Sequence, residues 1–156
     1  MQASTFRSTR VPGTRHPVPG GAVSLLLLFA WAFAAATILP LSSEVALVVE
    51  IVRRGDWQVP VLVATVGNVL GAATTYALAR FAVTHAPSPS PRVARASALL
   101  ARYGSPALLL SWVPVIGDLI VALAGAARMP LLPFAFWTTV GKAARYVAVA
   151  IAVSQR

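Results

Sequence analysis

The chain has no cysteine among its 156 residues, which excludes disulfide bonds and every cysteine-ligated metal or iron–sulfur site. Histidine is almost as scarce, because only His16 and His85 occur and they lie far apart in presumed loops. No G-x-S-x-G, Walker A or H-E-x-x-H motif is present, and Ser42, Ser43 and Ser111 have no histidine nearby to activate them. We therefore expect no metal, no cofactor and no catalytic residue, and the sequence does not favour an enzyme.

Charge is also scarce, since 11% of the residues are charged and 58% are hydrophobic. A soluble domain has roughly a quarter of its residues charged, so the composition predicts an all-α integral membrane protein. The few charges are mostly positive, with thirteen Lys and Arg against four acids and a net charge of +9. These bases form no contiguous stripe, so we expect them to meet anionic lipid headgroups rather than nucleic acid.

The amino-terminal segment 1–20 has arginines, prolines and hydroxyl residues without an apolar face, which predicts a disordered basic tail. A signal peptide is the alternative, with Arg7, Arg10 and Arg15 as its basic region and a cleavage site in the stretch Ala32 to Ala36. We favour retention of the segment, because the apolar run continues beyond Ala36 and the internal repeat described below requires it.

A first apolar hairpin is predicted between residues 22 and 56. Ala22 to Leu39 is uncharged and would be ~27 Å long as a helix. Pro40 breaks it, and Val45 to Val52 then runs to a hydrophilic turn at residues 53–56. This second arm is about half the length needed to cross a bilayer. We therefore predict a re-entrant hairpin that enters the membrane and returns to the same side.

Trp57 to Phe81 is long enough to span the membrane. We interpret its Gly67 and Gly71 as a close helix-packing site, whereas Asn68 at mid-span requires a polar partner. Residues 92–102 have the spacing of an amphipathic helix that lies on the headgroups.

A second hairpin is predicted from Tyr103 to Ala127, with its break at Pro114 and Gly117, and Leu131 to Val153 forms a last span. Asp118 lies within this apolar stretch, where placing a charged carboxylate in the membrane costs free energy. Such a residue is by default interpreted as functional.

The two halves of the chain match when the sequence is shifted by 74 residues. The pairs of matching positions are Pro40 and Pro114, Glu44 and Asp118, Arg54 and Arg128, Gly67 and Gly141, and Asn68 and Lys142. We infer one membrane domain, residues 21–153, built from two repeats at about 22–84 and 97–153. Each repeat has a hairpin that returns and one helix that crosses, so the second must enter from the opposite face. The predicted fold is thus an inverted repeat of two units, each a re-entrant hairpin plus a transmembrane helix.

Glu44, Asp118, Lys142 and Arg145 are all expected at membrane depth, where an isolated Asp, Lys or Arg costs at least ~2.5–3.5 kcal/mol. We expect two acid–base pairs between the repeats and, together with Asn68, a site for substrate and protons. The bases could hold a phosphate or another anionic headgroup, and an acid with raised proton affinity could carry H⁺. The alternative is that these are permanent structural ion pairs. Glu50 and Arg80 lie nearer segment ends and are expected to reach the membrane surface.

Several motifs resemble the DedA superfamily, also called the VTT-domain or SNARE-associated family, and within it the YqaA-type branch. They are Leu39-Pro40-x-Ser42-Ser43-Glu44, Gly67-Asn68-x-x-Gly71, Arg102-Tyr103-Gly104, Ser111-Trp112-x-Pro114-x-x-Gly117-Asp118 and Gly141-Lys142-Ala143-x-Arg145-Tyr146. The resemblance covers about residues 23–153. It implies two facing re-entrant hairpins in a bacterial inner membrane and movement of phospholipid or undecaprenyl phosphate between leaflets, linked to the proton-motive force.

The resemblance also implies that Glu44 is the family's essential acid. One departure stands out: other members have arginines on both sides of the second proline, where this chain has Ser111 and Gly117. Lys142 and Arg145 could supply the missing cations. The first hypothesis is therefore a lipid or lipid-phosphate translocase that is coupled to H⁺. The alternative is a non-transporting scaffold or envelope-homeostasis factor whose charges only hold the fold.

Overall fold

The computed structural model describes residues 21–37, 42–81 and 90–155, which form helices and no strand. The elements are α1 (Gly21–Thr37), α2 (Ser43–Arg54), α3 (Gln58–Phe81), α4 (Pro91–Tyr103), the 3₁₀ helix η1 (Ser105–Trp112), α5 (Ile116–Ala126) and α6 (Leu131–Ser154). The all-helical class predicted from the composition is confirmed. The predicted tail, residues 82–89 and the first hairpin's Pro40 lie outside the described residues.

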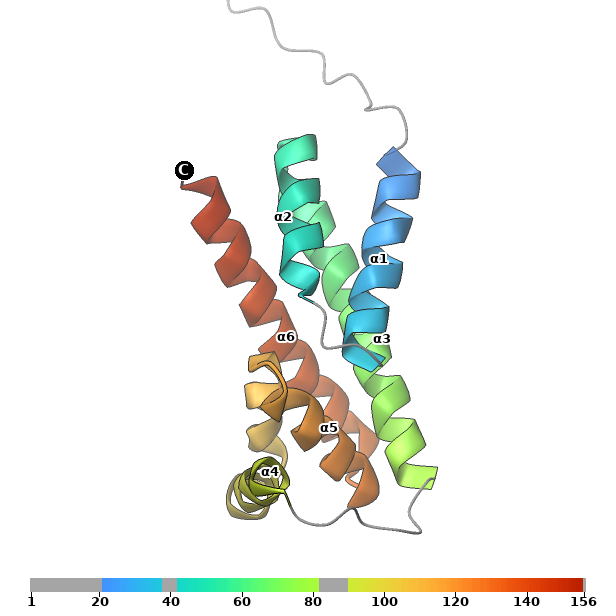
Figure 1. Ribbon diagram of the computed structural model, residues 1–156, viewed down its shortest axis with the longest axis vertical. Helices are drawn as coiled ribbons and strands as arrows, with labels where there is room; N and C mark the ends of the chain where they lie inside the picture. Colours follow the sequence, from blue (N-terminus) through green and yellow to red (C-terminus); the bar gives the residue numbers. More distant parts are fainter. Residues whose placement is uncertain (1–20, 38–41, 82–89, 156) are drawn as a thin grey trace, which may run out of the picture.

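Two long helices extend along the height of the molecule, and shorter helices pair at each end (Figure 1). The long helices are α3 and α6, with 24 residues each. At the upper end α1 and α2 run in opposite directions beside α3, and at the lower end η1 and α5 do the same, with η1 packed on α6 and α5 packed on α3 (Figure 1). The amphipathic α4 lies across the lower end and packs on α5 and η1. Each short pair brings its inner ends to the middle of the bundle.

The second break occurs at Pro114, as the sequence predicts, but its form is unusual. The amide of Ile116 donates to the carbonyl of Pro114 at 2.8 Å, which closes a three-residue γ-turn with Val115 at φ 68° and ψ −53°. This is a strained conformation for a β-branched residue. The chain then reverses so tightly that a Cβ on Gly117 would lie 2.7 Å from the Cα of Ser111. Position 117 therefore requires glycine.

Glycines also set how closely the long helices approach the hairpin arms. A Cβ on Gly67 would lie 2.6 Å from the carbonyl oxygen of Phe29 in α1, and a Cβ on Gly71 would lie closer still to that of Phe33. Gly141 of α6 has the same relation to Leu109 of η1, again at 2.6 Å. The packing interpretation of Gly67 and Gly71 agrees with these contacts, since any larger side chain would push α1 away from α3.

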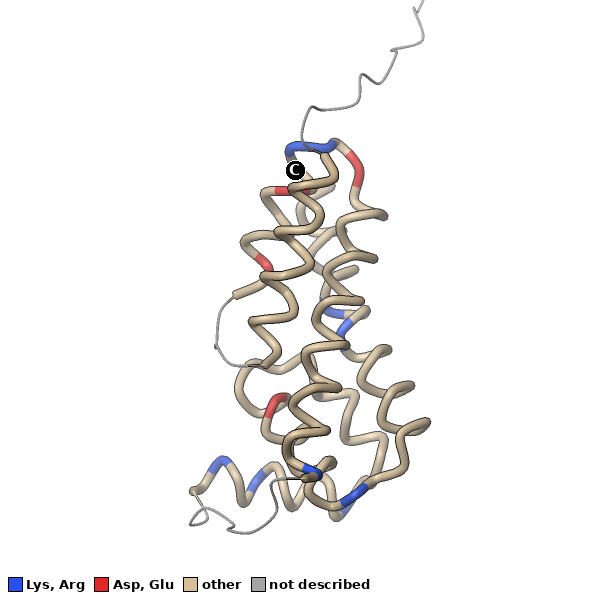
Figure 2. The backbone as a smooth tube through the Cα atoms, turned by 90° about the vertical axis from the view of Figure 1, so that its right-hand side faces the viewer, with Lys and Arg blue, Asp and Glu red and all other residues tan. Residues whose placement is uncertain are grey.

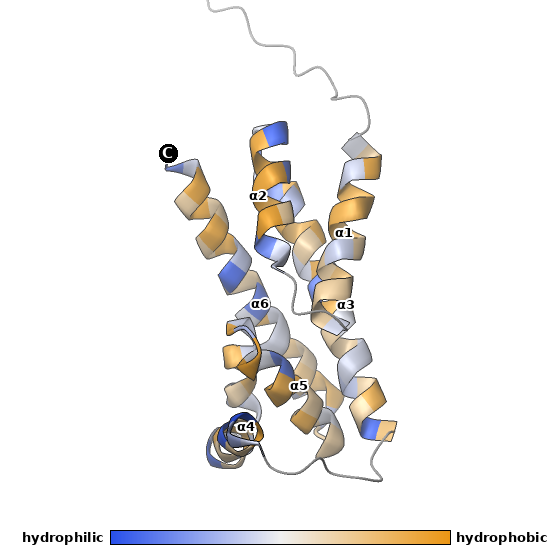
Figure 3. Ribbon diagram, viewed as in Figure 1, coloured by the Kyte–Doolittle hydropathy of each residue, from blue (hydrophilic) through white to orange (hydrophobic). Residues whose placement is uncertain are grey.

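The outer surface is strongly apolar, as Figure 3 shows by the hydrophobic colour along the helices. Large side chains are widely exposed on several elements, for example Leu26 (66%), Leu62 (64%) and Leu132 (85%). Among the described residues α3 is the one helix that is both long enough and apolar enough to cross a membrane, while α1 and α5 are shorter apolar helices. Charged residues are grouped at the two ends and around the middle of the bundle (Figure 2).

Candidate functional site

A cavity of about 190 Å³ lies where the inner ends of both hairpins meet α3 and α6. Its lining comes from α1, α2, α3, the η1–α5 turn and α6, so residues from both halves of the sequence contribute. The polar part of this lining includes Glu44, Asn68, Ser111, Asp118, Lys142 and Arg145. The structure thus places all five predicted substrate and proton residues around one space, together with Pro114 of the second break.

One of the two expected ion pairs is present. The Nε of Arg145 donates to Oε1 of Glu44 at 2.8 Å, and the hydroxyl of Ser42 donates to the other carboxylate oxygen at 3.2 Å. Glu44 also lies in the first turn of α2, where the helix dipole favours a negative charge. The pair joins α2 of the first half to α6 of the second and forms one wall of the cavity.

Lys142 has a neutral partner in place of an acid. Its Nζ donates to the Oδ1 of Asn68, and the Nδ2 of that amide donates to the hydroxyl of Tyr146 at 2.7 Å. The Tyr146 hydroxyl is also 2.7 Å from the Oγ of Ser43 at the start of α2. All four side chains are buried, so this chain of hydrogen bonds connects α2, α3 and α6 in the interior. It supplies the partner that mid-span Asn68 requires.

Asp118 corrects the expectation of a second ion pair. In the described ranges no cation lies within 4.0 Å of its carboxylate, although it lines the same cavity as Lys142 and Arg145. The two cations bind other partners, and residues three apart on a helix differ by about 60° around its axis. Lys142 therefore faces α3 and Arg145 faces α2. The hydroxyl of Ser111, beside this cavity, is buried and also lacks a partner among the described atoms.

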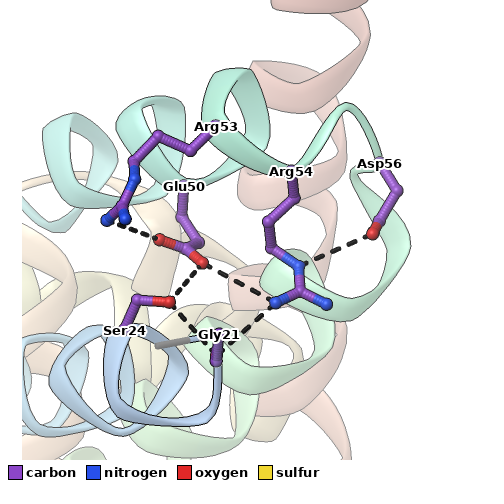
Figure 4. A network of polar contacts seen from close by, with 6 residues as sticks. All are labelled: Gly21, Ser24, Glu50, Arg53, Arg54 and Asp56. Carbon is purple, nitrogen blue, oxygen red and sulfur yellow. Dashed lines mark hydrogen bonds and ion pairs between the residues drawn. The ribbon is translucent and has the colours of Figure 1, made fainter. Parts of the chain in front are cut away.

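A second polar network lies at the outer end of α1 and α2 (Figure 4). Glu50 accepts a 2.7 Å hydrogen bond from Ser24 and lies 3.9 Å from Arg54, which in turn is 3.6 Å from Asp56. The side chain of Glu50 is only 6% exposed, so the expectation that it reaches the membrane surface is wrong. The hydroxyl of Ser24, one helix away, binds its carboxylate inside the bundle. Arg80 likewise turns inward and donates to the Tyr76 hydroxyl at 2.9 Å.

Sequence reasoning missed Tyr146 and Ser43 as parts of the central network. Tyr146 follows Lys142 by four residues, so both lie on one face of α6, and a buried tyrosine hydroxyl requires a partner. That spacing is the signal that could have found it. Ser43 offers no comparable signal, because its partner is 103 positions away in the sequence.

Comparison with known families gives an independent result for nearly the whole chain. The family model of the VTT domain matches residues 11–155. The chain belongs to the VTT-domain family. The resemblance drawn from the motifs is thereby confirmed.

Two relatives of this VTT-domain protein cover most of its length. It is 46% identical over 136 residues to the inner membrane protein YqaA of Escherichia coli, with 86% of this chain and 94% of that protein covered. It is 42% identical over 133 residues to an uncharacterized protein of Haemophilus influenzae, covering 80% and 84%. No solved structure matches. The predicted location in the bacterial inner membrane is confirmed by the family, the relative's name and the candidate membrane helix.

Proposed function

We propose that this VTT-domain protein moves a phospholipid or lipid phosphate between the leaflets of the inner membrane, through the cavity between two re-entrant hairpins. The observation that carries the proposal is the incomplete pairing of this cavity. Glu44 and Arg145 satisfy each other, whereas Asp118 and the hydroxyl of Ser111 have no partner among the described residues. Unpaired polar groups at membrane depth are costly, and a polar ligand would satisfy them.

The inverted repeat is supported by contacts between matching positions. Asn68 and Lys142 are 74 residues apart and bind each other, as two residues on a pseudo-two-fold axis would. Gly67 and Gly141, also 74 apart, each pack against the first arm of their own hairpin. These contacts favour two units of opposite orientation whose hairpins, α1–α2 and η1–α5, enter from opposite faces.

The residues of the cavity have the chemistry for a phosphate headgroup and a proton. Arg145 carries further guanidinium donors besides the Nε that binds Glu44, and Lys142 supplies a second cation. Asp118 is the acid that is free to gain and lose a proton without breaking an ion pair. In this scheme Arg145 and Lys142 attract the headgroup, and Asp118 couples its movement to H⁺.

The test is leaflet exchange of a fluorescent anionic phospholipid in vesicles that contain the purified protein. The wild type should accelerate exchange over empty vesicles. Asp118→Asn should abolish the acceleration while leaving the thermal unfolding temperature unchanged, because no pair is broken. Glu44→Gln should abolish exchange and also lower stability. An exposed control, Ser97→Ala in α4, should behave as wild type. Wild-type vesicles that exchange lipid no faster than empty ones would refute the proposal.

A scaffold function is the second candidate, because the ion pair and the hydrogen-bonded chain are complete internal networks. A double-mutant cycle with Glu44→Gln and Arg145→Gln separates the two hypotheses. If the pair is only structural, each single change should destabilise the protein by about 1 kcal/mol and the double change should cost less than the sum of the two. The double variant should then support growth under envelope stress as the wild type does. Loss of that growth phenotype in a stable double variant would instead favour transport.

A further inference from the structure

A second hollow lies directly beside the central cavity, on the membrane-facing side of α6. It is a groove of about 310 Å³, formed by Leu109 and Trp112 of η1 and by Gly141, Ala144, Arg145 and Ala148 of α6. Apart from Arg145 its lining is apolar. Ala144 and Ala148 are exposed and Trp112 is 50% exposed, so in a bilayer the groove opens onto hydrocarbon.

Arg145 lines both the groove and the central cavity. The last turn of η1 completes the partition, since Ser111 and Val113 line the cavity while Leu109 and Trp112 line the groove. The polar central cavity, which has two cations, is thus separated from the apolar groove only by the guanidinium of Arg145 and one turn of helix. A free phosphate would bind only in the central cavity, and a neutral hydrocarbon would bind only in the groove.

We propose that the groove holds an acyl chain of an anionic phospholipid while the headgroup of that same lipid binds at Arg145. The inference rests on the proposed function and names its substrate class and the path of the tail. The occupant is a lipid of the surrounding bilayer, because this site combines a positive charge with an apolar groove that opens onto the membrane. The small side chains of Ala144 and Ala148 leave the groove open along α6.

The absence of cysteine makes a direct binding test possible. Ala148→Cys is labelled with a fluorophore in vesicles of phosphatidylcholine, and quenching by phosphatidylglycerol with brominated chains is compared with quenching by brominated phosphatidylcholine. We expect a preference for the anionic lipid of about fivefold, the factor for a contact of ~1 kcal/mol. The matched control is Ala135→Cys, an exposed alanine of α6 outside the groove, where no preference should appear.

Two further changes test the link between headgroup and tail. Arg145→Gln should remove the preference at position 148, and Ala144→Phe should reduce quenching there by filling the groove while the Glu44–Arg145 pair remains. Equal quenching by both lipids, or a preference that survives Arg145→Gln, would overturn the inference. Leaflet exchange is measured on the same vesicles. Preference without exchange would refute only the proposed function, and exchange without preference would refute only this site.

Discussion

Tyr146 shows how much of the interior depends on a single hydroxyl. It bonds Ser43 from one half of the chain and Asn68 from the long helix of that half, and through Asn68 it reaches Lys142. Tyr146 is 1% exposed, so its hydroxyl depends on these partners inside the protein. The cation at Lys142 is therefore held in place by a neutral chain and not by an acid.

Tyr146→Phe should lower the free energy of unfolding by about 1–3 kcal/mol, the cost of leaving buried polar groups unpaired. Denaturation in detergent measures this loss. Tyr103→Phe is the matched control, because Tyr103 is 52% exposed and its hydroxyl makes no hydrogen bond among the described residues. Equal stability of the two variants would mean that the hydroxyl of Tyr146 is not needed.

At the scale of elements, the sequence predicted the break at Pro114, the amphipathic α4 and the two long helices, while the re-entrant course of the hairpins stays a prediction. It did not predict that the first arm of the second hairpin is a 3₁₀ helix of eight residues. Runs of that length are uncommon, and the leucines of this arm suit either helix type. The arm packs on α6, and at ~2.0 Å per residue a 3₁₀ helix reaches further toward the middle than an α-helix of equal length. Such a tertiary effect is not visible in local sequence.

The turn between η1 and α5 gives a prediction at this scale. Val115→Gly should raise the free energy of unfolding by about 1 kcal/mol, since glycine adopts a positive φ without the strain that valine carries. Val115 is 42% exposed, so little packing is lost. Thermal unfolding of the purified protein measures the change. A Val115→Gly variant that is less stable than wild type would show that the turn carries no such strain.

For the molecule as a whole, the candidate site illustrates what a repeat can and cannot predict. The shift of 74 residues identified the two acids, the amide and Lys142 that line one cavity, and Arg145 follows Lys142 by three residues. It could not assign partners, because Lys142 and Arg145 lie on one helix and only the packing of α2 and α3 decides which acid each can reach. Asp118 thus stays unpaired although its counterpart Glu44 is paired.

The proposed inverted repeat predicts which membrane face each turn occupies. Gln58→Cys, just after the α2–α3 turn, and Ala127→Cys, in the α5–α6 turn, are both exposed and lie at opposite ends of the bundle. A membrane-impermeant thiol reagent should label one of them from outside intact cells and the other only after lysis. Labelling of both from the same side would contradict the inverted repeat.

The ionic cluster of Ser24, Glu50, Arg54 and Asp56 has no equivalent in the other half of the chain. The matching positions hold Ala98, Ala124, Arg128 and Pro130, which can form no such cluster. Ion pairs therefore stabilise one end of the bundle, whereas apolar packing mainly stabilises the opposite end. Local unfolding should begin at the end without the ionic cluster. Amide protons of α5 should therefore exchange with deuterium sooner than those of α2.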